Sequence, residues 1–207
     1  EERGVVRRFG EFMSISEPGL HFKLPVGIDS VTRVPAQDRV LKQEFGFRTE
    51  RAGQNTEYSS QDFPEESLML TGDLNIIDLE WVVQYNIIDP QNYLFNIRNV
   101  DETLRDVSEA IMRRIVGNQL GSQALSTARP DIARQSREEV QQIMENYNSG
   151  IQIRAVELQD VVPPDRVRPA FNEVNVARQE RERMINEAEK RRNQQIPRVR
   201  GEAKQTI

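Results

Sequence analysis

Few side chains in this sequence of 207 residues have the chemistry that catalysis or metal binding requires. His21 is the only histidine, and Glu17 precedes it across a Pro-Gly turn, so a paired acid and base is not indicated. The lack of cysteine excludes thiolate chemistry, and with a single histidine it also excludes a structural zinc site. Two adjacent acidic pairs, Glu65-Glu66 and Asp101-Glu102, are typical of solvated loops and helix starts. We therefore expect no enzyme, no cofactor and no metal. Hydrolase activity is an alternative that the missing nucleophile–base pair opposes.

Charge is distributed unevenly along the chain. The net charge is −5, but residues 165–207 hold 11 basic and 7 acidic residues, or +4, which leaves −9 for residues 1–164. An acidic body with a mildly basic end lacks the concentrated basic face of a nucleic-acid-binding protein. Opposite signs at the two ends favour association between copies.

The first third of the chain predicts short strands and a loop. Strands are expected over residues 5–9, 20–24, 29–34 and 37–42, with Phe9 and Phe22 in the core at odds of two to one over a membrane interface. The polar residues 43–66 predict a long exposed loop.

The strongest secondary-structure signal is a hairpin around Thr71-Gly72-Asp73. It joins a strand over residues 67–70 to one over 74–87, where apolar residues alternate with polar ones. Trp81 lies on the apolar face of the second strand, so core packing is favoured about nine to one over ligand stacking.

Helices follow over residues 101–117 and from about Pro130 to Tyr147. A strand over 151–162 then stops at Pro163-Pro164. This mixture of elements without strict alternation predicts an α+β fold. The expected buried stripe of the second helix is Ile132, Val140, Ile143 and Tyr147.

A long charged helix is expected from Asp165 onward. Arg178 and Arg181 interrupt its apolar seam, so the sequence does not predict an autonomous two-stranded coiled coil. Pro197 and Gly201 are expected to break or kink it.

Six motifs follow one another along the chain: Glu2–Gly10, Glu17–Pro25, Thr71–Asn75, Trp81–Tyr85, Leu104–Gly117 and Gly150–Pro164. In this order they resemble the band-7 (SPFH) superfamily of stomatins, prohibitins, flotillins and the bacterial HflK and HflC proteins. The tail, residues 195–198 followed by 201–203, is similar to HflK rather than HflC.

This resemblance implies a two-lobed domain followed by a long helix. The lobes would be a membrane-proximal β-rich lobe over residues 1–66 and an α+β lobe over 67–164, with the helix over 165–207. It also implies an oligomeric scaffold with a membrane anchor upstream of Glu1, on the extracytoplasmic side of the bacterial inner membrane. An HflC-type paralogue and the FtsH protease are the implied partners. The alternative is a homo-oligomeric organiser of stomatin or flotillin type without a protease partner.

Two sets of residues are candidates for contacts outside the chain. Phe12 and Met13 are the membrane-proximal candidates, because they are expected to fall in a turn region before Pro18-Gly19. The assembly candidates on the last helix are Phe171, Val174, Ile185 and Ala188. A lone helix cannot bury such a stripe, so either a neighbouring subunit covers it or the body of the same chain folds back over it. The sequence leaves these two possibilities equal.

Overall fold

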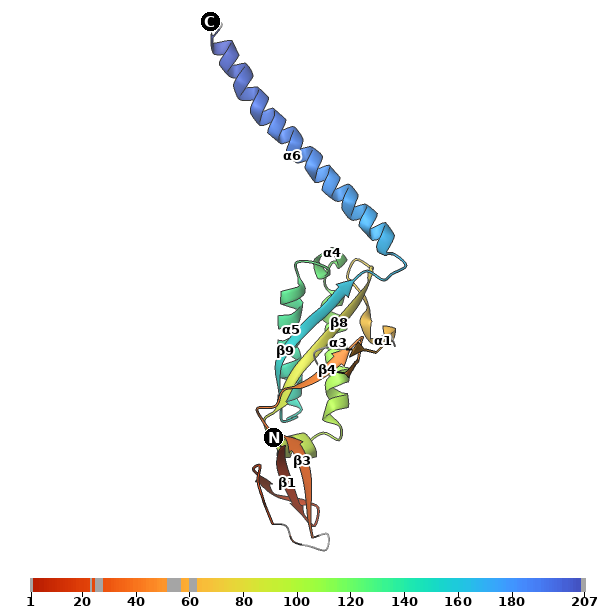
Figure 1. The fold of residues 1–207 in the computed structure, drawn as a ribbon, viewed down its shortest axis with the longest axis vertical. Coiled ribbons are helices and arrows are strands. Elements are labelled where there is room, and N and C mark those ends of the chain that lie inside the picture. Colours follow the sequence, from red (N-terminus) through yellow and green to blue (C-terminus); the bar gives the residue numbers. More distant parts are fainter. Residues whose placement is uncertain (1, 23, 25–27, 52–56, 60–62, 206–207) are drawn as a thin grey trace. The chain divides into compact units, whose positions relative to one another are not determined.

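The computed structural model describes residues 2–22, 24, 28–51, 57–59 and 63–205. Figure 1 shows the strands, the helices that accompany them and the long helix α6 (Arg168–Gln205). The chain divides into two compact units, residues 1–162 and residues 163–207, and each is described by itself below. The further division of the first unit into lobes at residue 66 stays a proposal.

A three-stranded antiparallel sheet begins the chain. It consists of β1 (Glu2–Arg8), β2 (Glu11–Ser16) and β3 (Asp29–Pro35), in the order β2-β1-β3. Phe9 and Gly10 both have positive φ, of 51° and 92°, which allows the tight turn between β1 and β2.

Two expectations for this region are wrong. Leu20 and Phe22 lie outside any strand, although the predicted strand over 20–24 includes both. Phe9 and Phe22 are 81% and 98% exposed, so neither is a core residue. Alternation of apolar and polar residues shows which side chains share a face, but it does not show what covers that face.

The second sheet is built around β8 (Ile76–Ile87). On one side β8 pairs with β9 (Ile151–Val162), and on the other with β4 (Leu41–Phe45) and β7 (Leu68–Leu70). All pairings are antiparallel. The predicted buried face of β8 is confirmed, because its residues 77, 79, 81, 83, 85 and 87 are at most 5% exposed. Val82 and Asn86, which point to the opposite face, are buried as well, so burial does not alternate along the whole strand.

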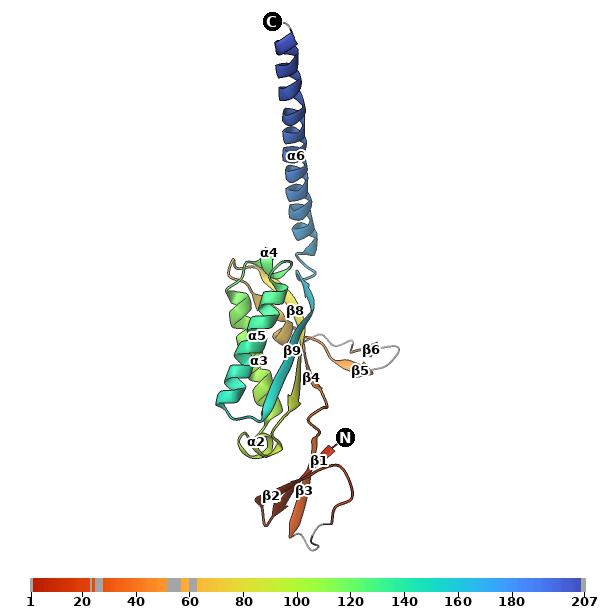
Figure 2. The ribbon, with the colours of Figure 1, turned by 90° about the vertical axis from the view of Figure 1, so that its left-hand side faces the viewer.

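Helices cover one face of this second sheet (Figure 2). The two long ones are α3 (Val100–Gly117) and α5 (Arg129–Asn146). Three short helices, α1 (Pro64–Ser67), α2 (Pro90–Phe95) and α4 (Gly121–Ala124), lie in the connections. The α+β class is confirmed. Along α5 the buried stripe includes Met144 in place of Tyr147, which is half-exposed.

The expectation of one exposed loop over residues 43–66 is also wrong. Phe45 is fully buried, and its ring stacks on Trp81 with the centroids 4.5 Å apart. The segment also contains the small pair β5 (Thr49–Arg51) and β6 (Glu57–Tyr58) and most of α1. Gly53, which the loop prediction used, lies outside the described residues.

Helix α6 is the second unit's regular element. Its first residue is Arg168, whose guanidinium lies 2.7 Å from the Asp165 carboxylate. The helix continues through Pro197 to Gln205, so the predicted break at Pro197 or Gly201 does not occur. Charged residues one turn apart, such as Arg183 and Glu187, contribute a little to the stability of the helix.

Candidate functional site

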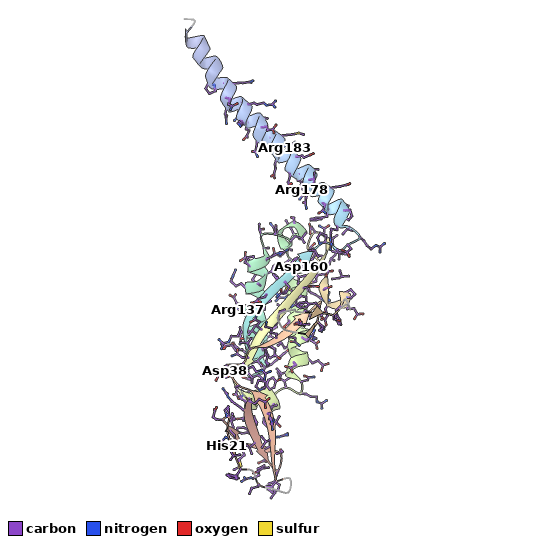
Figure 3. The ribbon with its side chains drawn as sticks, in the orientation of Figure 1. His21, Asp38, Arg137, Asp160, Arg178 and Arg183 are labelled. Carbon is purple, nitrogen blue, oxygen red and sulfur yellow. The ribbon has the colours of Figure 1, made fainter. Side chains whose placement is uncertain are left out.

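His21 has the surroundings of an exposed surface residue. Its Nε2 donates a hydrogen bond to the backbone carbonyl of Glu17 at 2.7 Å. Figure 3 shows it beside the three-stranded sheet, at the opposite end of the first unit from Asp160. Within the described part of the chain, no three His, Asp or Glu residues gather in a way that could hold a metal ion.

The acidic pair Glu65-Glu66 is not simply solvated, which corrects the prediction for Glu66. Its carboxylate accepts hydrogen bonds from Arg48 at 2.7 and 3.0 Å, from Arg105 at 2.9 Å and from the Gly46 amide at 3.0 Å. Burial alone would raise the pKa of Glu66, but the bonds from Arg48 and Gly46 and both arginine charges outweigh it. The pKa therefore lies below its ordinary value.

The arginines that hold Glu66 also pack on aromatic rings. The guanidinium of Arg48 lies 4.4 Å from the centroid of Phe63, and that of Arg105 lies 4.8 Å from the centroid of Phe45. Glu66 therefore ties the segment before β7 to α3 and to the Phe45–Trp81 stack. This network is structural, because every group in it is paired within the fold.

Replacing Glu66 by Gln should lower the free energy of unfolding by about 1–3 kcal/mol at pH 7, because two arginines lose their charged acceptor. The pKa of Glu66 is depressed in the folded state. The ionised Glu66 carboxylate therefore contributes its full stability above the unfolded-state pKa of about 4.3, and this stability is lost as the pH falls through the folded-state pKa. Urea unfolding of the unchanged protein and of the Glu66→Gln variant, measured between pH 7 and pH 3, should show that the difference between their free energies of unfolding becomes smaller as the pH falls.

Glu65→Gln is the matched control. It removes the same charge at the neighbouring position, where the side chain is exposed. It should change the free energy of unfolding by less than about 0.5 kcal/mol. Equal losses for the two variants would contradict a specific role for the Glu66 network.

The second acidic pair is also structural. The Asp101 carboxylate accepts hydrogen bonds from the hydroxyls of Tyr85 and Tyr93 at 2.8 and 3.2 Å, while Glu102 pairs with the helix-capping residue Asn99. Burial and the Asp101 charge raise the pKa of Tyr93 to about 12, and they raise the pKa of Tyr85 as well. Both tyrosines therefore stay protonated donors and are unsuited to general-base chemistry.

The membrane-proximal candidates Phe12 and Met13 lie on strand β2, so their expected place in a turn is wrong. The Phe12 ring packs edge-on against Phe95 with centroids 6.2 Å apart, so it is partly covered, whereas Met13 is half-exposed. Exposed apolar side chains are also concentrated around the same sheet. They are Phe9, Ile15, Leu20, Phe22, Leu24 and Val31. Sequence analysis assigned Phe9 and Phe22 to the core and so missed this concentration.

Helix α6 exposes an apolar stripe. Val174 and Ile185 are 50% and 49% exposed, Ala188 is exposed, and Phe171 is partly covered. With about 100° of rotation per residue, these four residues fall within roughly one third of the helix circumference. Nothing in α6 itself can cover such a stripe. No helix among the described residues is both long and apolar enough to cross a bilayer.

Comparison with known proteins gives a consistent result. A family model described as "SPFH domain / Band 7 family" matches residues 1–192. The chain is 39% identical to the protein HflK of Treponema pallidum over 204 residues, and 34% identical to the protein HflK of Vibrio cholerae over 202 residues. It is 31% identical over 202 residues to the Escherichia coli K12 protein described as "Modulator of FtsH protease HflK".

These alignments cover 98% of this chain but 61%, 46% and 43% of the three relatives, respectively. The chain thus spans roughly half the length of the curated relatives it matches. The similarity concerns the strands and helices of the first unit and much of α6.

Proposed function

Because the chain belongs to the SPFH / Band 7 family, we propose that it forms the scaffold part of a membrane-anchored, HflK-type modulator of an FtsH-type protease. An HflC-type paralogue would be its partner in a mixed assembly. The anchor would precede Glu1, and the domain would lie on the extracytoplasmic side of the inner membrane. The description of the Escherichia coli relative as a modulator of FtsH protease supports the protease partner.

The observation that carries the proposal is the unpaired apolar stripe on α6. A helix of 38 residues with exposed Val174 and Ile185 gains stability when another helix or domain covers it. The catalytic alternative has no comparable support, because the acidic and aromatic groups described above are engaged in structural bonds.

The mechanism would be steric. Copies standing side by side around a membrane patch would form a wall, and the wall would limit which membrane proteins reach the enclosed protease. Apolar side chains around the first sheet, Met13 and Phe22 among them, would face the bilayer surface. The predicted lobe over residues 1–66 would then be the membrane-proximal part of each subunit.

The test is co-purification. An affinity-tagged full-length protein, extracted from native membranes in mild detergent, should retain an FtsH-type protease and an HflC-type paralogue. A tagged inner-membrane protein of similar abundance and unrelated family serves as the control for carry-over. Recovery of a homo-oligomer without protease would contradict the HflK-type role and favour a stomatin-like organiser.

A further inference from the structure

A groove lies between the three-stranded sheet and residues 17–22, which we call the strap. The strap follows the end of β2, where Ser16 is paired with Gly4. Just beyond the strap, the backbone N–H of Leu24 donates to Asp29 Oδ2 at 3.0 Å. The chain is therefore bound to the sheet on either side of the strap. The groove has a volume of about 330 Å³, within the range of about 300–1,000 Å³ that is usual for small-ligand sites.

The floor of the groove is apolar. Gly4 and Val6 share one face of β1, and Val31 lies opposite Val6 on β3. A Cβ atom at Gly4 would lie 3.1 Å from Val31 Cγ1, so glycine keeps this part of the floor open. Phe22 borders the groove on the side of the strap, and its side chain is almost fully exposed. The floor and this wall therefore offer apolar surface to a ligand.

Charged groups of both signs border the same groove. The guanidinium of Arg33 lies 3.8 Å from the carboxylate of Glu2, which is longer than a hydrogen bond, and both side chains are at least half-exposed. Within the described part of the chain, the carboxylate of Glu17 has no partner. Arg3 also borders the groove, but its guanidinium donates to Gln37 at 3.1 Å. One arginine and two carboxylates can therefore bind a ligand that carries both charges.

The proposed anchor would bring this groove close to the bilayer. The anchor would precede Glu1, and Glu2 borders the groove. The side chains of Leu20 and Phe22 on the strap are 89% and 98% exposed. Exposed apolar side chains beside charged ones are typical of a protein surface that lies at the level of the lipid headgroups.

Resting on the proposed membrane-proximal place of the first sheet, we propose that the groove binds the headgroup of phosphatidylethanolamine. The lipid phosphate accepts hydrogen bonds from Arg33, and the primary ammonium donates to Glu2 and Glu17. The glycerol and the first methylene groups lie against Val31 and Phe22. Phosphatidylcholine has the same phosphate, but its quaternary ammonium has no N–H to donate, so the two carboxylates select ethanolamine over choline.

Vesicle binding by the chain of 207 residues tests this site. One set of vesicles consists of phosphatidylcholine alone, and in the other set phosphatidylethanolamine replaces half of it. Both lipids are zwitterionic, so the two sets do not differ in surface charge. Sedimentation with the vesicles should show about tenfold tighter binding to the set that contains ethanolamine, the effect of hydrogen bonds between charged groups.

Two variants on opposite sides of the groove identify the groups involved. Arg33→Gln and Glu17→Gln should each weaken binding to the ethanolamine vesicles about tenfold, and Glu17→Gln should leave binding to the choline vesicles unchanged. The two substitutions change the net charge in opposite directions, so overall charge cannot explain a loss in both. Arg137→Gln and Glu138→Gln, at exposed adjacent positions of α5, are the charge-matched controls and should bind like the unchanged chain.

Inorganic phosphate distinguishes a lipid headgroup from a free anion as the occupant. Added at matched ionic strength, it should leave binding to the ethanolamine vesicles unchanged. Loss of binding would show that free phosphate occupies the groove and would overturn the proposal. A preference for ethanolamine that survives Glu17→Gln would overturn it as well.

The outcomes separate this inference from the proposed function. Equal binding to both sets of vesicles overturns the headgroup site and leaves the membrane-proximal place of the first sheet standing. A chain that binds neither set overturns both. An intact preference for ethanolamine, together with a full-length protein that does not retain the protease, would overturn the proposed function alone.

Discussion

Phe171→Asp is expected to abolish self-assembly of the full-length protein and to leave the monomer folded. Phe171 lies in the first turns of α6 on the same face as Val174, and a neighbouring subunit would bury both. An unpaired carboxylate in that contact costs several kcal/mol, and about 3 kcal/mol already weakens association more than a hundredfold. Sizing in mild detergent and a thermal melt of the same sample measure the two effects separately.

Two matched variants sharpen this result. Phe171→Leu keeps an apolar side chain and should still assemble. Val176 is 54% exposed and lies about 140° around the helix from Phe171, so Val176→Asp places the same charge on another face and should also assemble. A lower melting temperature for Phe171→Asp in the isolated chain would instead show that the same chain covers this residue. Assembly and melting both unchanged would show that the stripe is not an interface.

Trp81→Ala should lower the free energy of unfolding by about 3–5 kcal/mol, the range for removing a large side chain from a core. The side chain of Trp81 is fully buried, and its ring lies nearly parallel to that of Phe45, at 5°. Denaturant unfolding followed by circular dichroism measures the loss. Tryptophan fluorescence is unsuitable, because Trp81 is the chain's only tryptophan.

Trp81→Phe is the informative control. Trp81 Nε1 is buried and has no hydrogen-bond acceptor among the described residues, so removing the indole N–H sacrifices no bond. The substitution should cost much less than Trp81→Ala, because an aromatic ring still stacks on Phe45. A loss below about 1 kcal/mol for Trp81→Ala would contradict the buried position and reopen a ligand-stacking role.

The parts of the fold that could be predicted are those in which one chain segment is buried by another. Alternation in β8 identified Trp81 and its neighbours as core, because the helices of the same chain cover that face. Helical spacing likewise predicted α3 and α5 to within a residue at either end. Tyr147 was misplaced because α5 ends at Asn146, so the spacing was extended past the last turn.

Sequence reasoning failed where burial depends on something other than local pattern. Phe22 sits among alternating residues, yet nothing in the described first unit covers it. Glu66 looked solvated because its arginine partners, Arg48 and Arg105, are 18 and 39 residues away. Leu74 gave no signal at all, since its positive φ depends on the turn that holds it. The assembly candidates on α6 remain predictions, which the experiments above address.

The uninterrupted course of α6 has a consequence for dimensions. A helix of 38 residues at about 1.5 Å per residue is roughly 57 Å long, and its length is fixed by its hydrogen bonds. It therefore fixes the distance between its two ends, which would be the same in every subunit of the proposed assembly. Inserting seven residues would lengthen α6 by about 10 Å and rotate the part of its apolar face beyond the insertion by only about 20°. Inserting five residues would rotate that part of the face by about 140°, so that it would no longer line up with the face before the insertion.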